Sequence, residues 1–277
     1  MRLRISLIYP LAAVWLALVP AAASAQQAAQ PPAAEEFKPQ VGQHGKDVIW
    51  VPTPQALVDK MLDMAKVGPG DTLFDLGSGD GRTVITAATR GAIAHGIEYN
   101  PDMVELSQRN ALKAGVADKA TFAKADIFES DFSKASVVTL FLLPRLNIKL
   151  RPTLLAMPPG TRIVSNSFDM GDWTPDLTVH VTEGCTGYCR AHLWIVPAKV
   201  AGRWALAGGR GELVLEQTFQ VVTGTLTTGN VIAPLMDARL DGERFTFTAG
   251  GKRYTGQVKG DTIEGTGPEG QWQATRK

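Results

Sequence analysis

The sequence predicts an α/β fold built on a doubly wound sheet, followed by a small all-β domain. The first observation is an apolar strand pattern at residues 72–76 that runs into three alternate glycines and a helical pattern opening at Arg82. Such strand–turn–helix units are typical of open parallel sheets. The second is a change near Gly202, where helical periodicity ends and short alternating runs between glycine turns begin. A chain of 277 residues is long enough for one large and one small domain.

The composition and charge of the chain bear on the partners that it could bind. The chain is 44% hydrophobic and 20% charged, and its formal net charge is +1. So balanced a charge does not favour broad binding to nucleic acid or to membrane surfaces.

Residues 1–25 have the pattern of a secretory signal peptide. Arg2 and Arg4 supply a positive start, residues 11–19 an apolar core, and Ala23-Ser24-Ala25 a cleavage site. We therefore expect a periplasmic or secreted protein without a membrane span after cleavage, and the alternative is a retained membrane anchor. Residues 26–46 are rich in Ala, Gln and Pro, which predicts a disordered linker.

The next elements alternate between helix and strand. Thr53 and Pro54 suit the N-cap and first position of a helix that ends near residues 68–70. Asn100-Pro101 is a similar start for a helix that ends by Gly115. The remaining elements of this first part are strands at 92–98, 120–125, 136–143 and 161–167, a helix at 145–156, and an antiparallel hairpin of strands at 177–182 and 190–196.

The glycine turn after residue 76 predicts a binding site for a zwitterion. Glycine at 77, 79 and 81 removes every Cβ from alternate positions, so a ligand can approach the backbone closely. N–H groups at the start of the following helix favour an anionic group. Asp75 at the strand end can hold an amine. Together these features suit the methionyl end of S-adenosylmethionine.

Two further acids follow the next two strands. Glu98 lies 17 residues after Gly81, where a carboxylate can accept hydrogen bonds from ribose hydroxyls. Asp126 follows the third strand, where it can accept from the adenine amino group. The alternative is a dinucleotide, but its GxGxxG fingerprint requires glycine or alanine at the position of Arg82.

At this point the sequence resembles a known family, the class I (seven-strand) S-adenosylmethionine-dependent methyltransferases. The closer likeness is to the subfamily that includes the mitochondrial protein-lysine methyltransferases, and it rests on motifs at residues 51–54, 75–82 and 141–144. It covers about residues 48–198 and implies a Rossmann-like methyltransferase domain at 47–200, with an added β meander or barrel at 201–277. The resemblance implies these cofactor-binding residues: Asp75, Gly77, Ser78, Gly79, Asp80, Gly81, Glu98, Asp126 and Ile127.

The acceptor is less well defined than the cofactor. The resemblance implies a protein lysine amine, and we expect residues that orient this amine rather than a strong base. Leu143, Asn166 and Asp169 are the candidates, and Trp50 is either a lid aromatic or a packed side chain. The sequence lacks the Asn/Asp-Pro-Pro-aromatic turn that usually accompanies methylation of adenine or cytosine, so no nucleic-acid partner is expected.

The two cysteines predict a disulfide rather than a metal site. Cys185 and Cys189 lie in one short loop, and an oxidising compartment favours their pairing. Two thiols do not supply four metal ligands, and the histidines form no ligand motif. Export creates a conflict, because S-adenosylmethionine is a cytoplasmic metabolite. This motivates the alternative of an exported binding protein that keeps the methyltransferase fold without turnover.

Overall fold

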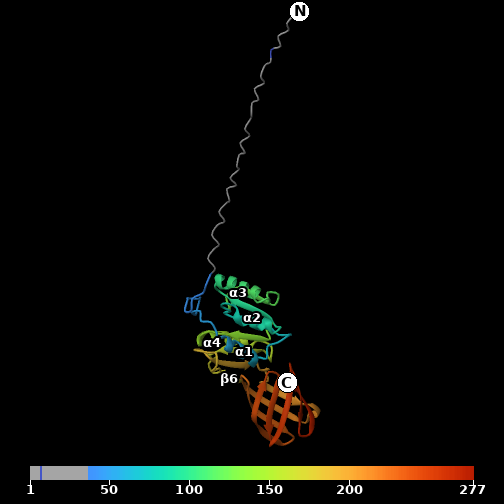
Figure 1. Ribbon diagram of the computed structural model, residues 1–277. Coiled ribbons are helices and arrows are strands. Elements are labelled where there is room, and N and C mark those ends of the chain that lie inside the picture. The colour runs from blue at the N-terminus through green and yellow to red at the C-terminus, as the bar shows by residue number, and fades with distance from the viewer. Residues whose placement is uncertain (1–6, 8–36) are drawn as a thin grey trace, which may run out of the picture. The chain divides into compact units, whose positions relative to one another are not determined.

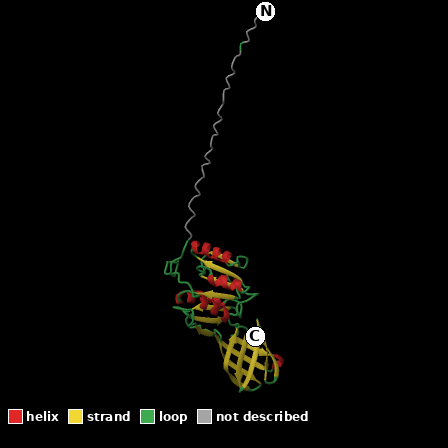
Figure 2. Cartoon of the chain, in the orientation of Figure 1, coloured by secondary structure: helices red, strands yellow, loops and turns green. Residues whose placement is uncertain are grey.

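A computed structural model of the chain describes Leu7 and residues 37–277. Apart from Leu7, the predicted signal peptide at 1–25 lies outside the described residues, and so does the 26–36 part of the predicted linker. The described chain contains an α/β domain and a C-terminal β-barrel (Figure 1). Figure 2 shows the long helices gathered around the first sheet, whereas the C-terminal domain consists almost entirely of strands.

The α/β domain alternates strands and helices along the chain. Its elements are α1 (Gln55–Met64), β1 (Thr72–Leu76), α2 (Arg82–Thr89), β2 (Ile93–Glu98), α3 (Pro101–Lys113), β3 (Ala120–Lys124), β4 (Val137–Leu140), α4 (Pro144–Leu155), β5 (Arg162–Asn166), β6 (Leu177–His180) and β7 (Arg190–Ile195).

The seven strands form one sheet in the order β3-β2-β1-β4-β5-β7-β6. Strands β1 to β5 are parallel, and β7 runs antiparallel to both β5 and β6. One apolar cluster packs α1, α2 and α3 against the sheet, and another packs α4 against its other face. The chain order reverses between β1 and β4, which places the ends of β1, β2 and β3 beside a crevice. The predicted doubly wound seven-strand sheet is therefore confirmed.

Two local predictions need correction. Strand β4 ends at Leu140 and not at residue 143, so Phe141 and the next two residues leave the sheet before α4 begins at Pro144. Helix α1 begins at Gln55, with Pro54 at the N-cap position and no side-chain cap. The predicted cap, Thr53, instead accepts a hydrogen bond from Asn166 through its hydroxyl. At Thr53, a tertiary contact thus takes the place of the local cap.

Residues 40–50 form a hydrogen-bonded turn, which corrects the prediction of a disordered linker through residue 46. The Trp50 N–H donates to the Gln43 carbonyl at 2.8 Å, and the Gly42 N–H donates to the Trp50 carbonyl at 2.8 Å. Within this turn the Gly45 N–H donates to the Val48 carbonyl at 2.9 Å. We call residues 40–50 the strap.

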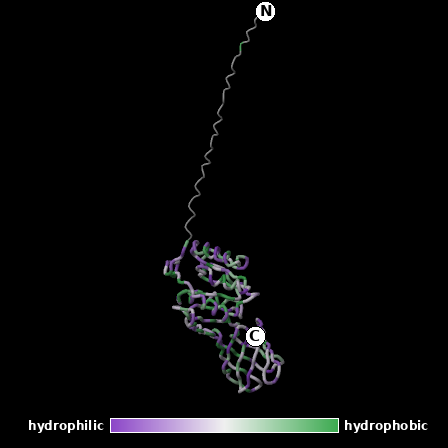
Figure 3. Tube along the Cα trace, viewed as in Figure 1, coloured by the Kyte–Doolittle hydropathy of each residue, from purple (hydrophilic) through white to green (hydrophobic). Residues whose placement is uncertain are grey.

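The C-terminal domain is a closed antiparallel barrel. Its strands are β8 (Gly202–Leu206), β9 (Gly211–Thr218), β10 (Val221–Thr228), β11 (Val231–Asp241), β12 (Arg244–Ala249), β13 (Lys252–Lys259), β14 (Thr262–Gly267) and β15 (Gly270–Arg276), with a short 3₁₀ turn, η1 (Ala207–Gly209), after β8. The predicted meander closes because β15 pairs with β8. Trp204, Phe245 and Phe247 are buried inside it. Figure 3 shows apolar and polar positions interspersed along the strands, as expected when alternate side chains face inward.

The loop between β9 and β10 contacts the α/β domain. The Trp173 indole N–H donates to the Gln220 side-chain oxygen at 3.0 Å, and the Gln220 amide donates to the Thr174 carbonyl at 2.7 Å. The rings of Trp173 and Phe219 stack with centroids 5.9 Å apart. Both Trp173 and Gln220 are buried, so the polar groups of this contact satisfy one another. Among the described helices, none combines the length and the apolar character needed to span a membrane.

Candidate active site

The glycine turn between β1 and α2 is held by hydrogen bonds from two directions. The Gly77 and Ser78 N–H groups donate to the Ile97 carbonyl at 2.8 and 3.0 Å. From α3, the Ser107 hydroxyl donates to the Gly79 carbonyl at 2.8 Å and the Asn110 amide donates to the Asp80 carbonyl at 3.0 Å. The turn is therefore set before a ligand arrives, with its backbone exposed toward the pocket.

The three glycines of the turn have different roles. All three have positive φ, at 84°, 55° and 82° for Gly77, Gly79 and Gly81, a region that glycine enters at low cost. Gly77 and Gly79 line the pocket. Gly81, predicted to bind the cofactor, does not line it. A Cβ there would lie 2.8 Å from the Phe122 ring, so this glycine permits close packing behind the turn.

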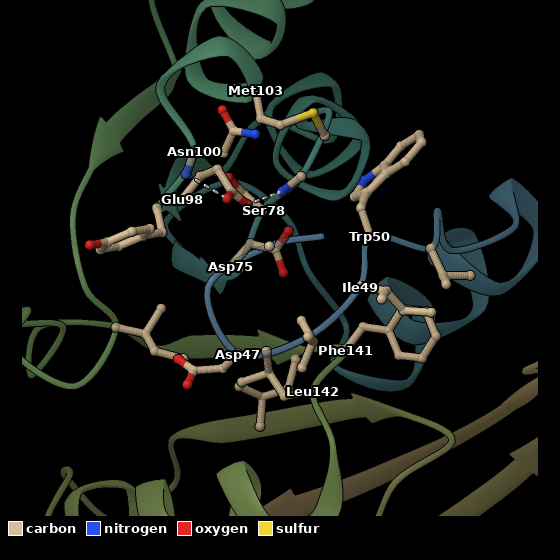
Figure 4. A pocket seen from close by; sticks show the side chains of 18 of the residues that line it. Asp47, Ile49, Trp50, Asp75, Ser78, Glu98, Asn100, Met103, Phe141 and Leu142 are labelled. Carbon is tan, nitrogen blue, oxygen red and sulfur yellow. Dashed lines mark hydrogen bonds between the residues drawn. The ribbon is translucent and has the colours of Figure 1, made fainter. Parts of the chain in front are cut away.

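Glu98 is oriented by the backbone on both of its carboxylate oxygens. It accepts from the Gly79 N–H at 2.9 Å and from the Asn100 N–H at 2.9 Å, and Figure 4 shows it on the wall of the pocket. One N–H of the turn is thus used by Glu98 and not by an incoming anion. Each carboxylate oxygen keeps a second lone-pair direction, which leaves acceptor capacity for a diol.

Asp75 is a buried carboxyl group at the end of β1. Its side chain accepts a hydrogen bond from the Thr139 hydroxyl at 2.7 Å, and the residue is only 7% exposed. Burial raises the pKa of Asp75 to about 7, with a further increase from Glu98 and Asp80, while the Thr139 bond acts in the opposite direction. A cationic ligand group beside Asp75 would stabilise its ionised form.

Asp80 and Asp126 line the same pocket but are paired with cations of the chain. Asp80 accepts from the Arg82 guanidinium at 3.0 and 2.6 Å. Asp126 accepts from the Lys46 ammonium of the strap and from the Phe128 N–H, and these two bonds hold its pKa below the usual value. Lys46 therefore occupies the position that the sequence offered to an adenine amino group.

Residues 43–50 of the strap line the pocket. Trp50 lies on the glycine turn, because a Cβ added to Gly79 would be 2.7 Å from its indole nitrogen. Lys46 lies 5.0 Å from the centre of the Tyr99 ring. The lining residues at 43–46 were missed because their composition predicted a linker, and those at 47–49 carried no motif; of the strap, only Trp50 was singled out from the sequence. Tyr99, Asn100 and Met103 were also missed, although they lie within five residues after Glu98.

The predicted acceptor residues fall in different places. Leu143 lines the pocket and is 37% exposed. Asn166 is fully buried, donates to the Thr53 hydroxyl and does not line the pocket. Asp169 is exposed, does not line the pocket, and accepts from the Gly171 N–H at 3.1 Å. Neither polar candidate is positioned to orient an acceptor, because each is engaged locally.

The remaining predicted cofactor residues, Ser78 and Ile127, both line the pocket. Phe141, Phe168 and Tyr188 line it as well, and Figure 4 shows Phe141 on the opposite side of the pocket from Glu98. Cys185 and Cys189 form a disulfide next to Tyr188, with their Cα atoms 5.8 Å apart. Sequence reasoning singled out this loop only for its cysteines. The pocket thus has an acidic end, at Asp75 and Glu98, and an aromatic end.

The residues present fit S-adenosylmethionine. The cavity of about 230 Å³ contains a cradle at Gly79 that a Cβ would obstruct, a buried carboxyl at Asp75 for an amine, and Glu98 for a ribose. Ile127 and Met103 add apolar surface for a base. When bound there, the sulfonium compound supplies an activated methyl group, and the chain has to position an acceptor and exclude water.

This fold and site define a nucleoside-binding α/β protein with a doubly wound sheet. A family profile described as "ANTKMT methyltransferase domain" matches residues 75–177. A protein-lysine N-methyltransferase of Saccharolobus islandicus is 42% identical over 140 residues, which cover 50% of this chain and 87% of that protein. An adenine nucleotide translocase lysine N-methyltransferase of Mus musculus is 34% identical over 120 residues, 43% of this chain and 52% of that protein.

A solved structure is similar over the same region. The chain is 49% identical to a protein described as an RNA methyltransferase from Salinibacter ruber in complex with S-adenosyl-L-homocysteine. The match has a TM-score of 0.51 and covers 54% of this chain and 96% of that one. The chain spans about half the length of the mouse protein but most of the archaeal and Salinibacter proteins.

The chain therefore belongs to the same methyltransferase family as the archaeal protein, with the ANTKMT methyltransferase domain at residues 75–177, and is an S-adenosylmethionine-dependent methyltransferase. These relatives are all described as methyltransferases, and the alternative of a binding protein without turnover gains no support from them.

Proposed function

We propose that this methyltransferase acts on the side-chain amine of a protein lysine. The observation that carries the proposal is the 42% identity to the archaeal protein-lysine N-methyltransferase across 87% of that protein. The match includes most of that protein and is therefore not confined to a short cofactor motif. It is stronger support than fold alone, which does not identify an acceptor.

The chemistry of the pocket supports an amine acceptor. A lysine amine must be neutral to attack, yet its unperturbed pKa is about 10.4. An apolar, desolvated environment lowers that value. The aromatic end of the pocket, with Phe141, Leu143 and Phe168, supplies such an environment. Asp80 and Asp126 are already paired with Arg82 and Lys46, so neither carboxylate is free to act as a base.

An RNA acceptor is the second candidate, because the Salinibacter relative is described as an RNA methyltransferase. Binding of RNA usually depends on lysine and arginine side chains that contact phosphates. Among the pocket-lining residues that the structure describes, Lys46 and Arg82 are the lysine and the arginine, and each is paired with a carboxylate. The net charge of +1 adds no strong field for RNA. A protein acceptor is therefore favoured.

The test supplies S-adenosylmethionine with an isotope-labelled methyl group to the protein in the presence of an envelope protein extract or total RNA. We expect label in protein, and peptide mass spectrometry should place it on lysine. Glu98→Gln should lower the labelling rate at least tenfold, whereas Glu105→Gln, an exposed glutamate on α3, should not. Label confined to RNA, or to side chains other than lysine, would overturn the proposal.

We propose further that the enzyme works outside the cytoplasm. The signal-like pattern of residues 1–25 and the Cys185–Cys189 disulfide support this compartment, because disulfides persist under oxidising conditions. Cell fractionation with intact-mass measurement tests it. The protein should be found in the envelope or the medium, should begin at Gln26, and should weigh two hydrogens less than the reduced chain. A full-length cytoplasmic protein with free thiols would contradict it.

A further inference from the structure

We propose that Phe141, Phe168 and Tyr188 form a binding site for the alkylammonium group of the acceptor, and that the Cys185–Cys189 disulfide positions the third ring. We call these three residues the aromatic triad. The inference rests on the proposed function, because it names the part of the pocket that would receive the lysine side chain.

The triad gathers rings from three separate segments. Phe141 follows β4, Phe168 follows β5, and Tyr188 precedes β7. The ring centroids are 6.1 Å apart for Phe141 and Phe168, 5.3 Å for Phe141 and Tyr188, and 5.9 Å for Phe168 and Tyr188. All three residues line the same pocket as Glu98 and Asp75. The rings therefore form one surface within the pocket.

The size of the triangle suits a cation. Its three sides put each centroid about 3.3 Å from the centre, so a cation seated roughly 3 Å above that point is about 4.5 Å from each ring. A cation is attracted to an aromatic ring within roughly 6 Å of its centre, and the attraction grows when water is excluded. The planes of Phe141 and Phe168 differ by 20°, and the Tyr188 plane is inclined to them by 64° and 54°, so Tyr188 supplies a wall at an angle to the other two rings. Groups of aromatic rings of this kind bind methylated ammonium groups in proteins.

The backbone around two of the rings is held in an uncommon conformation. Tyr188 itself has φ 55°, and Ser167, which precedes Phe168, has φ 60°. A bulky side chain with left-handed backbone is costly and persists only where neighbouring structure imposes it. The Ser167 N–H donates to the Arg190 carbonyl at 2.7 Å, and the disulfide closes the loop that carries Tyr188. Two of the five described non-glycine residues with positive φ thus lie at the triad.

The triad would act where charge develops in the reaction. The neutral amine nitrogen uses its lone pair to form a bond to the methyl carbon, while the carbon–sulfur bond breaks with its electrons going to sulfur. Positive charge moves from sulfur to nitrogen, and the resulting methylammonium then loses a proton to water. Aromatic faces next to that nitrogen stabilise the charge as it appears there.

A packing cluster with no ligand is the competing explanation, and a charge comparison separates the two. The probes are N-acetyl-trimethyllysine methylamide and its neutral analogue with a tert-butyl group in place of trimethylammonium. Their affinities are measured by titration calorimetry with saturating S-adenosyl-L-homocysteine. We expect the cationic probe to bind roughly two- to thirty-fold more tightly, the range that a cation near aromatic rings gives. Equal binding of the two probes would overturn the proposal.

Variants locate the effect. Tyr188→Leu should lower the ratio between the probes toward one, while Tyr188→Phe should keep it. Tyr99→Leu is the matched control, because Tyr99 lies in the same pocket and is 50% exposed, against 49% for Tyr188. In Tyr99→Leu, the ratio of the affinities for the cationic and the neutral probe should equal that of the wild type, even if the affinity for S-adenosyl-L-homocysteine changes. Wild-type affinity of Tyr188→Leu for S-adenosyl-L-homocysteine shows that it is folded. An unchanged ratio in Tyr188→Leu, or an equal loss in Tyr99→Leu, would contradict the assignment.

Removal of the two thiols tests the role of the disulfide. Cys185→Ser with Cys189→Ser should lower the ratio between the probes and leave affinity for S-adenosyl-L-homocysteine unchanged, because the acidic end comes from other segments. An undiminished ratio would refute positioning by the disulfide. None of these binding assays depends on turnover, so the proposal of the aromatic triad and the proposal of lysine methylation are tested independently. A charge preference without lysine labelling retains the triad, and lysine labelling without a charge preference removes it.

Discussion

Binding of S-adenosyl-L-homocysteine should depend on pH through Asp75. This carboxyl is 7% exposed, and burial raises its pKa to about 7. The ligand's ammonium group, if it lies beside Asp75, favours the ionised carboxylate. With a pKa of about 7, about one tenth of the free protein is ionised at pH 6 and about nine tenths at pH 8. The affinity should therefore be about tenfold higher at pH 8 than at pH 6.

The same group makes an opposite contribution to the stability of the ligand-free protein. Its folded-state pKa lies above the ordinary value of 3.8, so the folded state keeps a proton that the unfolded chain has already lost. The free energy of unfolding should therefore fall as the pH rises from about 4 to about 7, by up to about 1.4 kcal/mol per pH unit. Ligand binding should reverse part of this loss at neutral pH.

Calorimetry in buffers of different ionisation enthalpy measures both the affinity and the protons released. We expect release of about one proton per ligand below pH 6.5, and about none above pH 8. Asp75→Asn should bind more weakly and lose the dependence on pH, while Asp102→Asn, an exposed residue of α3, should keep it. An affinity that changes less than twofold between pH 6 and pH 8, or a slope that persists in Asp75→Asn, would refute the reasoning.

Two further predictions concern the strap and the turn. Gly79→Ala should weaken binding of S-adenosyl-L-homocysteine at least tenfold, because the new Cβ would lie 2.7 Å from the Trp50 indole nitrogen and the residue has φ 55°. Gly70→Ala is the control: this residue has φ 92° and open space around it, so the substitution should lower only the melting temperature. Similar affinities for the two variants would contradict this prediction. Lys46→Ala should tighten binding of adenosine a few-fold by calorimetry, because it frees Asp126 for the base. Weaker binding would show that Lys46 contributes to the site instead of competing for it.

Much of the acidic end was predictable because its determinants are local. Asp75 and Glu98 each terminate a parallel strand, and strand ends in a doubly wound sheet meet at one edge. The spacing of the glycines in the turn indicates that another group, either a ligand or a packed side chain, approaches the backbone closely there. Gly81 was misassigned because pattern alone does not distinguish a glycine that faces a ligand from one that faces Phe122.

The sequence alone was enough to predict the sheet, the β-rich C-terminal domain and the acidic end of the pocket. Each of these depends on a signal within a few neighbouring residues: alternation in the strands, turn residues, or the glycine motif. Only tertiary structure brought Lys46 to Asp126 and Tyr188 to Phe141. Those partners are separated by dozens of residues, and their meeting depends on how the strap and the disulfide loop pack on the finished sheet. Local propensity does not contain that information, because the contact energy exists only after the chain has folded.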